Sequence, residues 1–162
     1  MLKWSKEVNA VIEELVFDIP PFPFVRESLH KMDAKADLLV VSQTPGEALE
    51  REWKEHKIDN FVRVICGQEY GTKAEHLKFA AKGKYDAKKI LMIGDAPGDL
   101  SAAQVNEVLF YPIIPGHEDA SWERFYTEAL DRFFTGTYAG EYEQKLIEEF
   151  EAYLPENPTW KL

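Results

Sequence analysis

Cysteine is nearly absent from this sequence of 162 residues, in which Cys66 is the only one. A single cysteine excludes an internal disulfide and any zinc site built from several cysteines, and it fits a reducing compartment. Long apolar runs are missing too, since none approaches the ~20 residues that cross a bilayer. Residues 1–17 mix charged and apolar positions and do not resemble a signal peptide. The sequence therefore predicts a cytoplasmic protein that makes no use of a membrane.

Basic residues are in short supply, with 19 Lys+Arg against 29 Asp+Glu and a formal net charge of −10. Nucleic-acid affinity rests mostly on Lys and Arg that neutralise phosphates, so a nucleic-acid partner is not expected. Residues 117–162 hold eleven acids and four bases, a net of −7, which leaves −3 for residues 1–116. A site for an anionic substrate is therefore expected in the less acidic first part of the chain.

Short apolar runs alternate with amphipathic stretches from residue 37 onward, a pattern typical of a parallel sheet covered by helices. The expected strands are 38–41, 61–65, 90–93 and 108–111. The expected helices between them are about 44–57, 73–81 and 99–104, with Thr44 and Thr72 as the N-caps of the first two. The fold class is therefore α/β.

Three regions follow from this pattern. Residues 1–21 are expected to form a helical segment that ends in an extended, proline-rich connection. Residues 22–116 are expected to form the α/β core. Residues 117–162 are expected to form an acidic helical extension packed on that core, with a break between its helices at Gly136 and Gly140.

Polar side chains follow three of the predicted strands, where parallel sheets bind ligands. Ser42 follows the first strand, Lys73 begins the helix after the second, and Asp95 and Asp99 follow the third. Each has an ordinary structural interpretation: a capping serine, a solvated lysine, or a turn aspartate with a helix-capping aspartate. The aspartate pair is the most informative, because Mg²⁺ takes one or two carboxylates plus waters and phosphate oxygens.

Taken together and in order, these residues resemble the haloacid dehalogenase-like hydrolase superfamily over roughly residues 22–111. Residues 38–42 resemble its second motif, whose hydroxyl bonds the transferring phosphoryl group, and Lys73 resembles its third-motif lysine. Residues 90–99 are similar to its fourth motif, an apolar strand followed by Gly-Asp-x-x-x-Asp, and assign Mg²⁺ to Asp95 and Asp99. The resemblance implies a three-layer Rossmann-like core with a parallel sheet, and carboxyl-terminal helices beyond it.

One departure from the family is larger than the matches. Its first motif is a central strand ending in Asp-x-Asp, which supplies the nucleophile, and this sequence contains no Asp-x-Asp. Asp18 is the nearest candidate, but Pro20 then stands in place of the second aspartate. The alternative is that the sequence is the carboxyl-terminal part of a longer capped protein, with residues 2–17 as the last cap helix.

Two hypotheses of function follow. The first is a Mg²⁺-dependent hydrolase of small phosphorylated substrates, acting through an aspartyl-phosphate, whose present chain is inactive alone. The second is a non-catalytic phosphate- or Mg²⁺-binding or interaction domain of the same fold. Under either, loss of the central strand predicts a gap, a substituted strand, or self-association through an exposed sheet edge.

Overall fold

The computed structural model describes residues 19–81 and 83–154. Most of the segment 1–21, including Asp18 and the predicted helix 2–17, lies outside these residues. The first half of the described chain contains α2 (Val25–Met32), β1 (Leu39–Val41), α3 (Gly46–Glu55), β2 (Val64–Cys66) and α4 (Lys73–Ala80). The second half contains β3 (Leu91–Gly94), α5 (Pro97–Asn106), β4 (Leu109–Pro112), α6 (Glu118–Arg124), α7 (Leu130–Thr135) and α8 (Glu141–Tyr153).

Strands and helices alternate as the apolar pattern predicts, and the α/β class is confirmed. The strands form two parallel pairs, β1 with β2 and β3 with β4. β2 begins later than predicted, because Asp59–Phe61 form a 3₁₀ turn before it. Each pair is linked by a helical crossover, which is the connection that parallel strands require.

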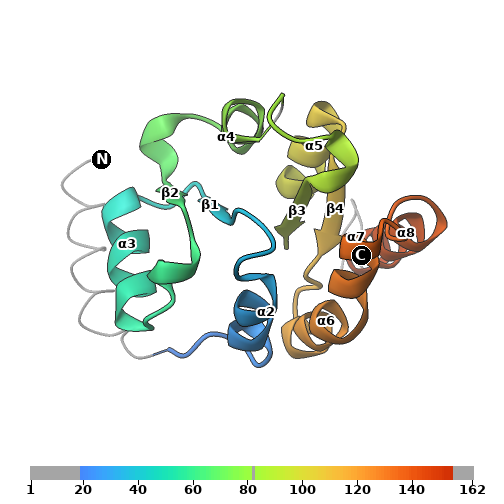
Figure 1. The fold of residues 1–162 in the computed structure, drawn as a ribbon, viewed down its shortest axis with the longest axis horizontal. Coiled ribbons are helices and arrows are strands. Elements are labelled where there is room, and N and C mark those ends of the chain that lie inside the picture. The colour runs from blue at the N-terminus through green and yellow to red at the C-terminus, as the bar shows by residue number, and fades with distance from the viewer. Residues whose placement is uncertain (1–18, 82, 155–162) are drawn as a thin grey trace, which may run out of the picture.

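The two pairs lie side by side in the order β2, β1, β3, β4, so β1 and β3 are the inner strands (Figure 1). No backbone ladder joins β1 to β3 within the described residues. A gap between the inner strands was one of the three outcomes predicted for a chain without the central strand. The described part of the chain therefore has a sheet divided at its middle.

The outer edge of β4 is closed by the carboxyl-terminal helices. The Glu143 carboxylate on α8 accepts a hydrogen bond from the Phe110 N–H at 2.8 Å, and the Tyr138 hydroxyl donates to the Phe110 carbonyl at 2.6 Å. Burial raises the pKa of the Glu143 carboxyl. Side chains thus satisfy the backbone groups that β4 presents away from β3.

Two hydrophobic clusters hold the layers together. One packs Tyr111 of β4 against Phe125 and Leu130, which lie in and after the π-helical turn Phe125–Ala129. The other packs Met92 of β3 against the helices α4 and α5 and against Phe150 of α8. β4 is buried along its whole length, whereas β1 is only half-buried. Burial is therefore greatest at the carboxyl-terminal side of the molecule, where α6–α8 pack on the sheet.

Helix α3 does not begin as predicted. Its N-cap is Pro45, with no side-chain cap of its own, and the prediction of Thr44 as N-cap was wrong. The Gly46 N–H instead donates to the Glu69 carboxylate, whose two oxygens lie 3.1 and 3.3 Å away. A carboxylate 23 residues distant along the chain thus takes the place of a local cap.

Helix α4 does begin as predicted, at a Thr72 cap. The Thr72 hydroxyl accepts from the Glu75 N–H at 3.3 Å, and the Thr72 N–H donates to the Glu75 carboxylate at 2.8 Å. These bonds form a capping box, and the Thr72 N–H followed by its hydroxyl lowers the pKa of the Glu75 carboxyl. The box fixes the first turn of α4, from which Lys73 projects.

Replacing Thr72 with alanine is expected to lower the free energy of unfolding by about 1 kcal/mol, the usual effect of losing a threonine cap. The measurement is urea unfolding followed by circular dichroism. Thr44→Ala is the matched control and should leave stability unchanged, because the Thr44 side chain caps no helix in the structure. Equal losses from the two substitutions would contradict the assignment of the cap.

Candidate functional site

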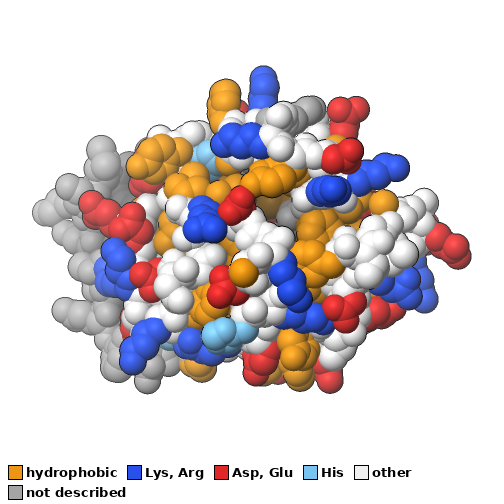
Figure 2. All heavy atoms as spheres, in the orientation of Figure 1, with side chains coloured by type: hydrophobic (Ala, Val, Ile, Leu, Met, Phe, Trp, Pro, Cys, Tyr) orange, Lys and Arg blue, Asp and Glu red, His pale blue; other side chains and the backbone are white. Residues whose placement is uncertain are grey.

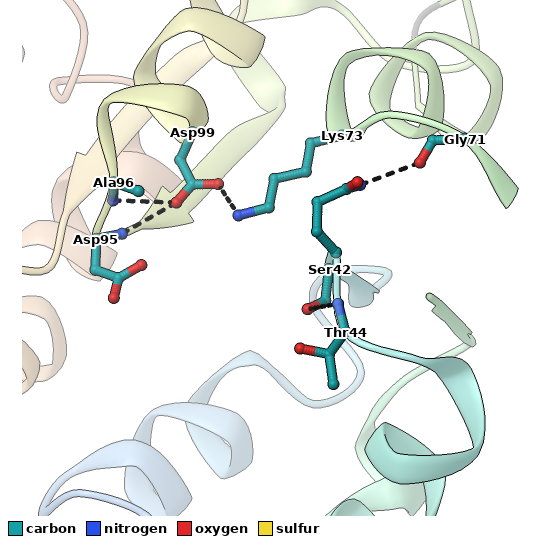
Figure 3. A network of polar contacts seen from close by, with 8 residues as sticks. Ser42, Thr44, Gly71, Lys73, Asp95, Ala96 and Asp99 are labelled. Carbon is teal, nitrogen blue, oxygen red and sulfur yellow. Dashed lines mark hydrogen bonds and ion pairs between the residues drawn. The ribbon is translucent and has the colours of Figure 1, made fainter. Parts of the chain in front are cut away.

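The predicted site residues gather where β1 and β3 end (Figure 3). Lys73, at the start of α4, forms an ion pair through its Nζ with Oδ1 of Asp99, in the first turn of α5. The Asp99 side chain is 2% exposed and the Lys73 side chain 26% exposed. This contact brings together two predicted residues that are 26 positions apart in the sequence.

Asp99 also organises the loop that follows β3. Its second oxygen, Oδ2, accepts from the backbone N–H groups of Asp95 and Ala96, each at 3.2 Å. Ala96 is the N-cap of α5 and has no side chain that could satisfy these donors. The buried carboxylate therefore combines the structural role of a helix-capping aspartate with an ion pair to Lys73.

Gly94 makes this arrangement possible. A Cβ placed on Gly94 would lie 2.4 Å from both Cβ and Cγ of Asp99. The side chain of Asp99 thus packs directly over the backbone at the end of β3. A glycine is required here for close approach, and the Gly-Asp-x-x-x-Asp spacing supplies it.

Asp95 lies differently from Asp99. Its side chain is exposed, and Figure 3 draws no contact between its carboxylate and Lys73. Within the described residues no hydrogen bond or ion pair reaches its carboxylate, although its backbone N–H is bonded to Asp99. The two carboxylates predicted as a metal-binding pair are therefore held in different environments. Asp99 is buried and already bonded to Lys73 and to the loop backbone, whereas Asp95 is open to solvent.

Ser42 follows β1 at the same end of the strands. Its N–H continues the ladder to the Cys66 carbonyl at 3.0 Å, and its hydroxyl accepts from the Thr44 N–H at 3.1 Å. That second bond is a local bond to the backbone, of the kind expected for a capping serine, and it occupies the hydroxyl that was predicted to bind a ligand. Figure 3 shows Lys73 on the side of Ser42 that faces Asp99.

Two neighbouring residues were not predicted to belong to the site. The Gln43 side-chain amide donates to the Gly71 carbonyl at 3.1 Å and so ties the end of β1 to the turn before α4. His76, one turn after Lys73, is 5% exposed, and neither ring nitrogen has a hydrogen-bond partner among the described residues. Neither residue has a spacing signal in the sequence, because both contacts and burial depend on the tertiary packing.

The carboxylates of this site can be compared with the ligands that Mg²⁺ requires. The described residues hold no group of three or more His, Cys, Asp or Glu side chains placed to bind one ion. Mg²⁺ needs only one or two carboxylates beside waters and phosphate oxygens, and Asp95 offers an open carboxylate. The residues fit the ion if Asp95 is the direct ligand and Asp99 holds the Asp95 backbone in place.

Comparison with protein families supplies the class. Residues 2–111 match the family of haloacid dehalogenase-like hydrolases. The match covers more than half of the chain, and its carboxyl-terminal limit coincides with β4. The protein belongs to the haloacid dehalogenase-like hydrolases, as the resemblance of its motifs predicts.

No curated protein and no solved structure matches the chain significantly. Within residues 19–81 and 83–154, none of the helices combines the length and the apolar character that a bilayer crossing needs.

Proposed function

We propose that this chain is the phosphate- and Mg²⁺-binding core of a phosphohydrolase that acts on a small phosphorylated substrate. The observation that carries the proposal is the Lys73–Asp99 ion pair, which joins the start of α4 to the loop after β3. It fixes the Lys73 ammonium against Asp99, which also binds the backbone of the loop that carries the exposed Asp95 carboxylate. This loop lies at the strand ends, where ligands bind in parallel α/β sheets. Family membership supports the same chemistry.

Each side chain has a distinct part in the proposal. Asp95 would hold Mg²⁺, which offsets the repulsion between a phosphate and a carboxylate. Asp99 keeps the Asp95 backbone and the Lys73 ammonium in place, and Lys73 neutralises phosphate charge. Ser42 donates its hydroxyl to a phosphate oxygen while continuing to accept from the Thr44 N–H, since a hydroxyl can do both.

None of the residues in this proposal serves as the nucleophile, which the family's Asp-x-Asp motif would supply. The sequence has no Asp-x-Asp, and Asp18 lies outside the described residues. The chain of residues 1–162 is therefore expected to bind ligand without turning it over. A domain that binds phosphate or Mg²⁺ without catalysis has the same site, and this missing motif is the observation that favours it. Reading the coding sequence upstream of Met1 for an in-frame Asp-x-Asp distinguishes the two.

The purified chain is expected to hydrolyse para-nitrophenyl phosphate in Mg²⁺ no faster than the Lys73→Ala variant does. The reason is that Lys73 can neutralise phosphate charge, but the sequence lacks the Asp-x-Asp that supplies the nucleophile in this family. Release of nitrophenolate is followed by absorbance. Turnover at about 1 s⁻¹ or more that Lys73→Ala abolishes would contradict the inactivity of the chain.

Asp95→Asn is expected to weaken Mg²⁺ binding about tenfold, because an amide oxygen replaces the open carboxylate as ligand. Isothermal titration calorimetry with MgCl₂ measures the affinity. Asp119→Asn is the matched control: it removes the same charge from an exposed position on α6 and should leave the affinity unchanged. Equal affinities for Asp95→Asn and the unaltered chain would mean that Asp95 does not bind the metal.

A further inference from the structure

Helix α5 lies between two open grooves. The first, of about 290 Å³, separates α5 from α4, and its lining includes Lys78 and Val105. The second, of about 430 Å³, separates α5 from α8, and its lining includes the carboxylates of Glu143, Glu148 and Glu151. Figure 1 shows α5 between α4 and α8. Because both grooves share α5 as a wall, the three helices form one surface, here called the α4–α5–α8 surface.

The groove beside α4 carries a lysine without an ion pair. Lys78 is exposed, and its ammonium lies 6.0 Å from the centroid of the Phe79 ring but forms no ion pair within the described residues. Glu75 also lines this groove, but its carboxylate already accepts from the N–H and the hydroxyl of Thr72 in the capping box. The groove beside α4 therefore presents a positive charge that the described part of the chain leaves unpaired.

The groove beside α8 carries the opposite charge. α8 contains five glutamates and one lysine. Glu148 accepts from the Gln144 side-chain amide at 3.2 Å, and neither Glu148 nor Glu151 forms an ion pair among the residues that the structure describes. Glu149 of the same helix differs, because Arg124 binds it through two hydrogen bonds of 2.7 and 3.1 Å. The carboxylates of this groove are thus left for a cation from another molecule.

Apolar side chains are exposed on the same surface. Val105 of α5 is 69% exposed, and Phe79 of α4 is 73% exposed. Valine is a weaker helix former than the polar residues that suit a solvated position, and it gains nothing from burial in a single chain. Figure 2 shows hydrophobic and lysine side chains projecting together over α4, and acidic side chains projecting over α8. Exposed apolar area with charge around it is typical of a protein–protein interface.

The two grooves flank one helix, which makes the surface complementary to itself. A two-fold axis running along α5 sets the α5 helices of two copies against each other, and α4 of each copy against α8 of the other. Lys78 of each copy then faces the acidic groove of the other copy. An axis across the helices would instead set α8 against α8 and bring carboxylates together, so the charges favour the axis along α5.

The size of the surface indicates how tightly two copies bind. A surface three helices wide and about ten residues long measures roughly 30 by 15 Å, so that two copies bury about 900 Å². Stable specific interfaces bury about 1,200 Å² or more. The contact is therefore expected to be weak and reversible.

We propose that two copies of this chain form a two-fold dimer through the α4–α5–α8 surface. Lys78 of each copy enters the acidic groove of the other, and the Val105 side chains of the two copies meet at the centre. A second copy is the partner because this chain itself carries both halves of the contact. The dimer does not use Lys73, Asp95 or Asp99, and the proposal is independent of the proposed hydrolase chemistry.

Sedimentation velocity of the full chain, from about 1 to about 500 μM, tests the proposal. The mass is expected to rise to twice that of one chain and to stop there, because a two-fold contact is closed. Added salt should weaken the dimer, since exposed charges take part in it.

Lys78→Glu and Glu148→Lys are each expected to weaken the dimer about tenfold or more, because like charges then meet at both contacts. An equimolar mixture of the two variants should dimerise as the unaltered chain does, since each contact again joins a lysine with a glutamate. Lys54→Glu is the matched control. It makes the same charge change at an exposed position on α3, far from α8 in Figure 1, and should leave the dimer unchanged.

Val105→Gln tests the apolar part of the contact. Glutamine is a better helix former than valine, so the fold should be retained, which circular dichroism verifies. The dimer is nevertheless expected to weaken about tenfold, because the apolar contact at its centre is lost.

Three results would overturn the proposal. The mass of a single chain throughout the concentration range would mean that the surface does not join two copies. Growth beyond the dimer would mean a head-to-tail contact without a two-fold axis. A dimer that Lys78→Glu and Val105→Gln both leave unchanged would have to use another surface, such as the inner sheet edges.

Discussion

Replacing Asp99 with alanine is expected to lower the free energy of unfolding by about 3 kcal/mol, the range found when one partner of a buried ion pair is removed. The carboxylate is buried, and it is the common acceptor for Lys73 and for the N–H groups of Asp95 and Ala96. Its removal leaves a partly buried ammonium and two backbone donors without an acceptor. Urea unfolding with a common m-value measures the loss.

Asp95→Ala is the control for this experiment, since it removes an exposed carboxylate from the same loop and should change stability by less than about 0.5 kcal/mol. Asp99→Asn should give an intermediate loss, because the amide oxygen can still accept a backbone N–H while the charge facing Lys73 is gone. If Asp95→Ala and Asp99→Ala cost the same, Asp99 is not the organising group of the loop.

Gly94→Ala is expected to cost about 2 kcal/mol, the middle of the range for adding a methyl group to a closely packed position. The added Cβ would lie 2.4 Å from Cβ and Cγ of Asp99, so either α5 or the end of β3 must shift. That shift would separate the Asp99 carboxylate from its backbone donors. The free energy of unfolding is again measured with urea, and Mg²⁺ affinity is expected to fall with it.

Gly98→Ala is the matched control four residues later. A Cβ on Gly98 meets nothing within 4 Å, and the residue lies in the first turn of α5, where alanine is a better helix former. Stability should be unchanged or should rise by up to about 1 kcal/mol. A loss at Gly98 as large as that at Gly94 would show that the effect comes from the helix and not from contact with Asp99.

The strands and the site edge could be predicted because their signals are local. The runs 38–41 and 90–93 are continuous and apolar, and a polar residue marks the end of each. Parallel strands place their carboxyl ends together, which is why Ser42, Lys73 and Asp99 could be assigned to one edge from spacing alone. Thr72 was recognisable as a cap for the same reason, since its bonds with Glu75 span only three residues.

The remaining features depend on contacts between distant segments. Glu69 replaces a local cap on α3 from 23 residues away, and Glu143 closes the edge of β4 from 33 residues away. Neither carboxylate stands out in a sequence with 29 acidic residues. The different environments of Asp95 and Asp99 could not be predicted from the sequence either, because the motif identifies both residues but not the direction of either side chain.

The amino-acid sequence alone determined the α/β class, the family motifs and the absence of Asp-x-Asp, because each depends on residue type and spacing along the chain. Only the tertiary structure decided that Asp99 is buried against Lys73 while Asp95 stays exposed, and that the inner edges of β1 and β3 are left unpaired among the described residues. The physical reason is that burial and backbone pairing are set by which segments pack together, and spacing within one segment carries no record of its neighbours.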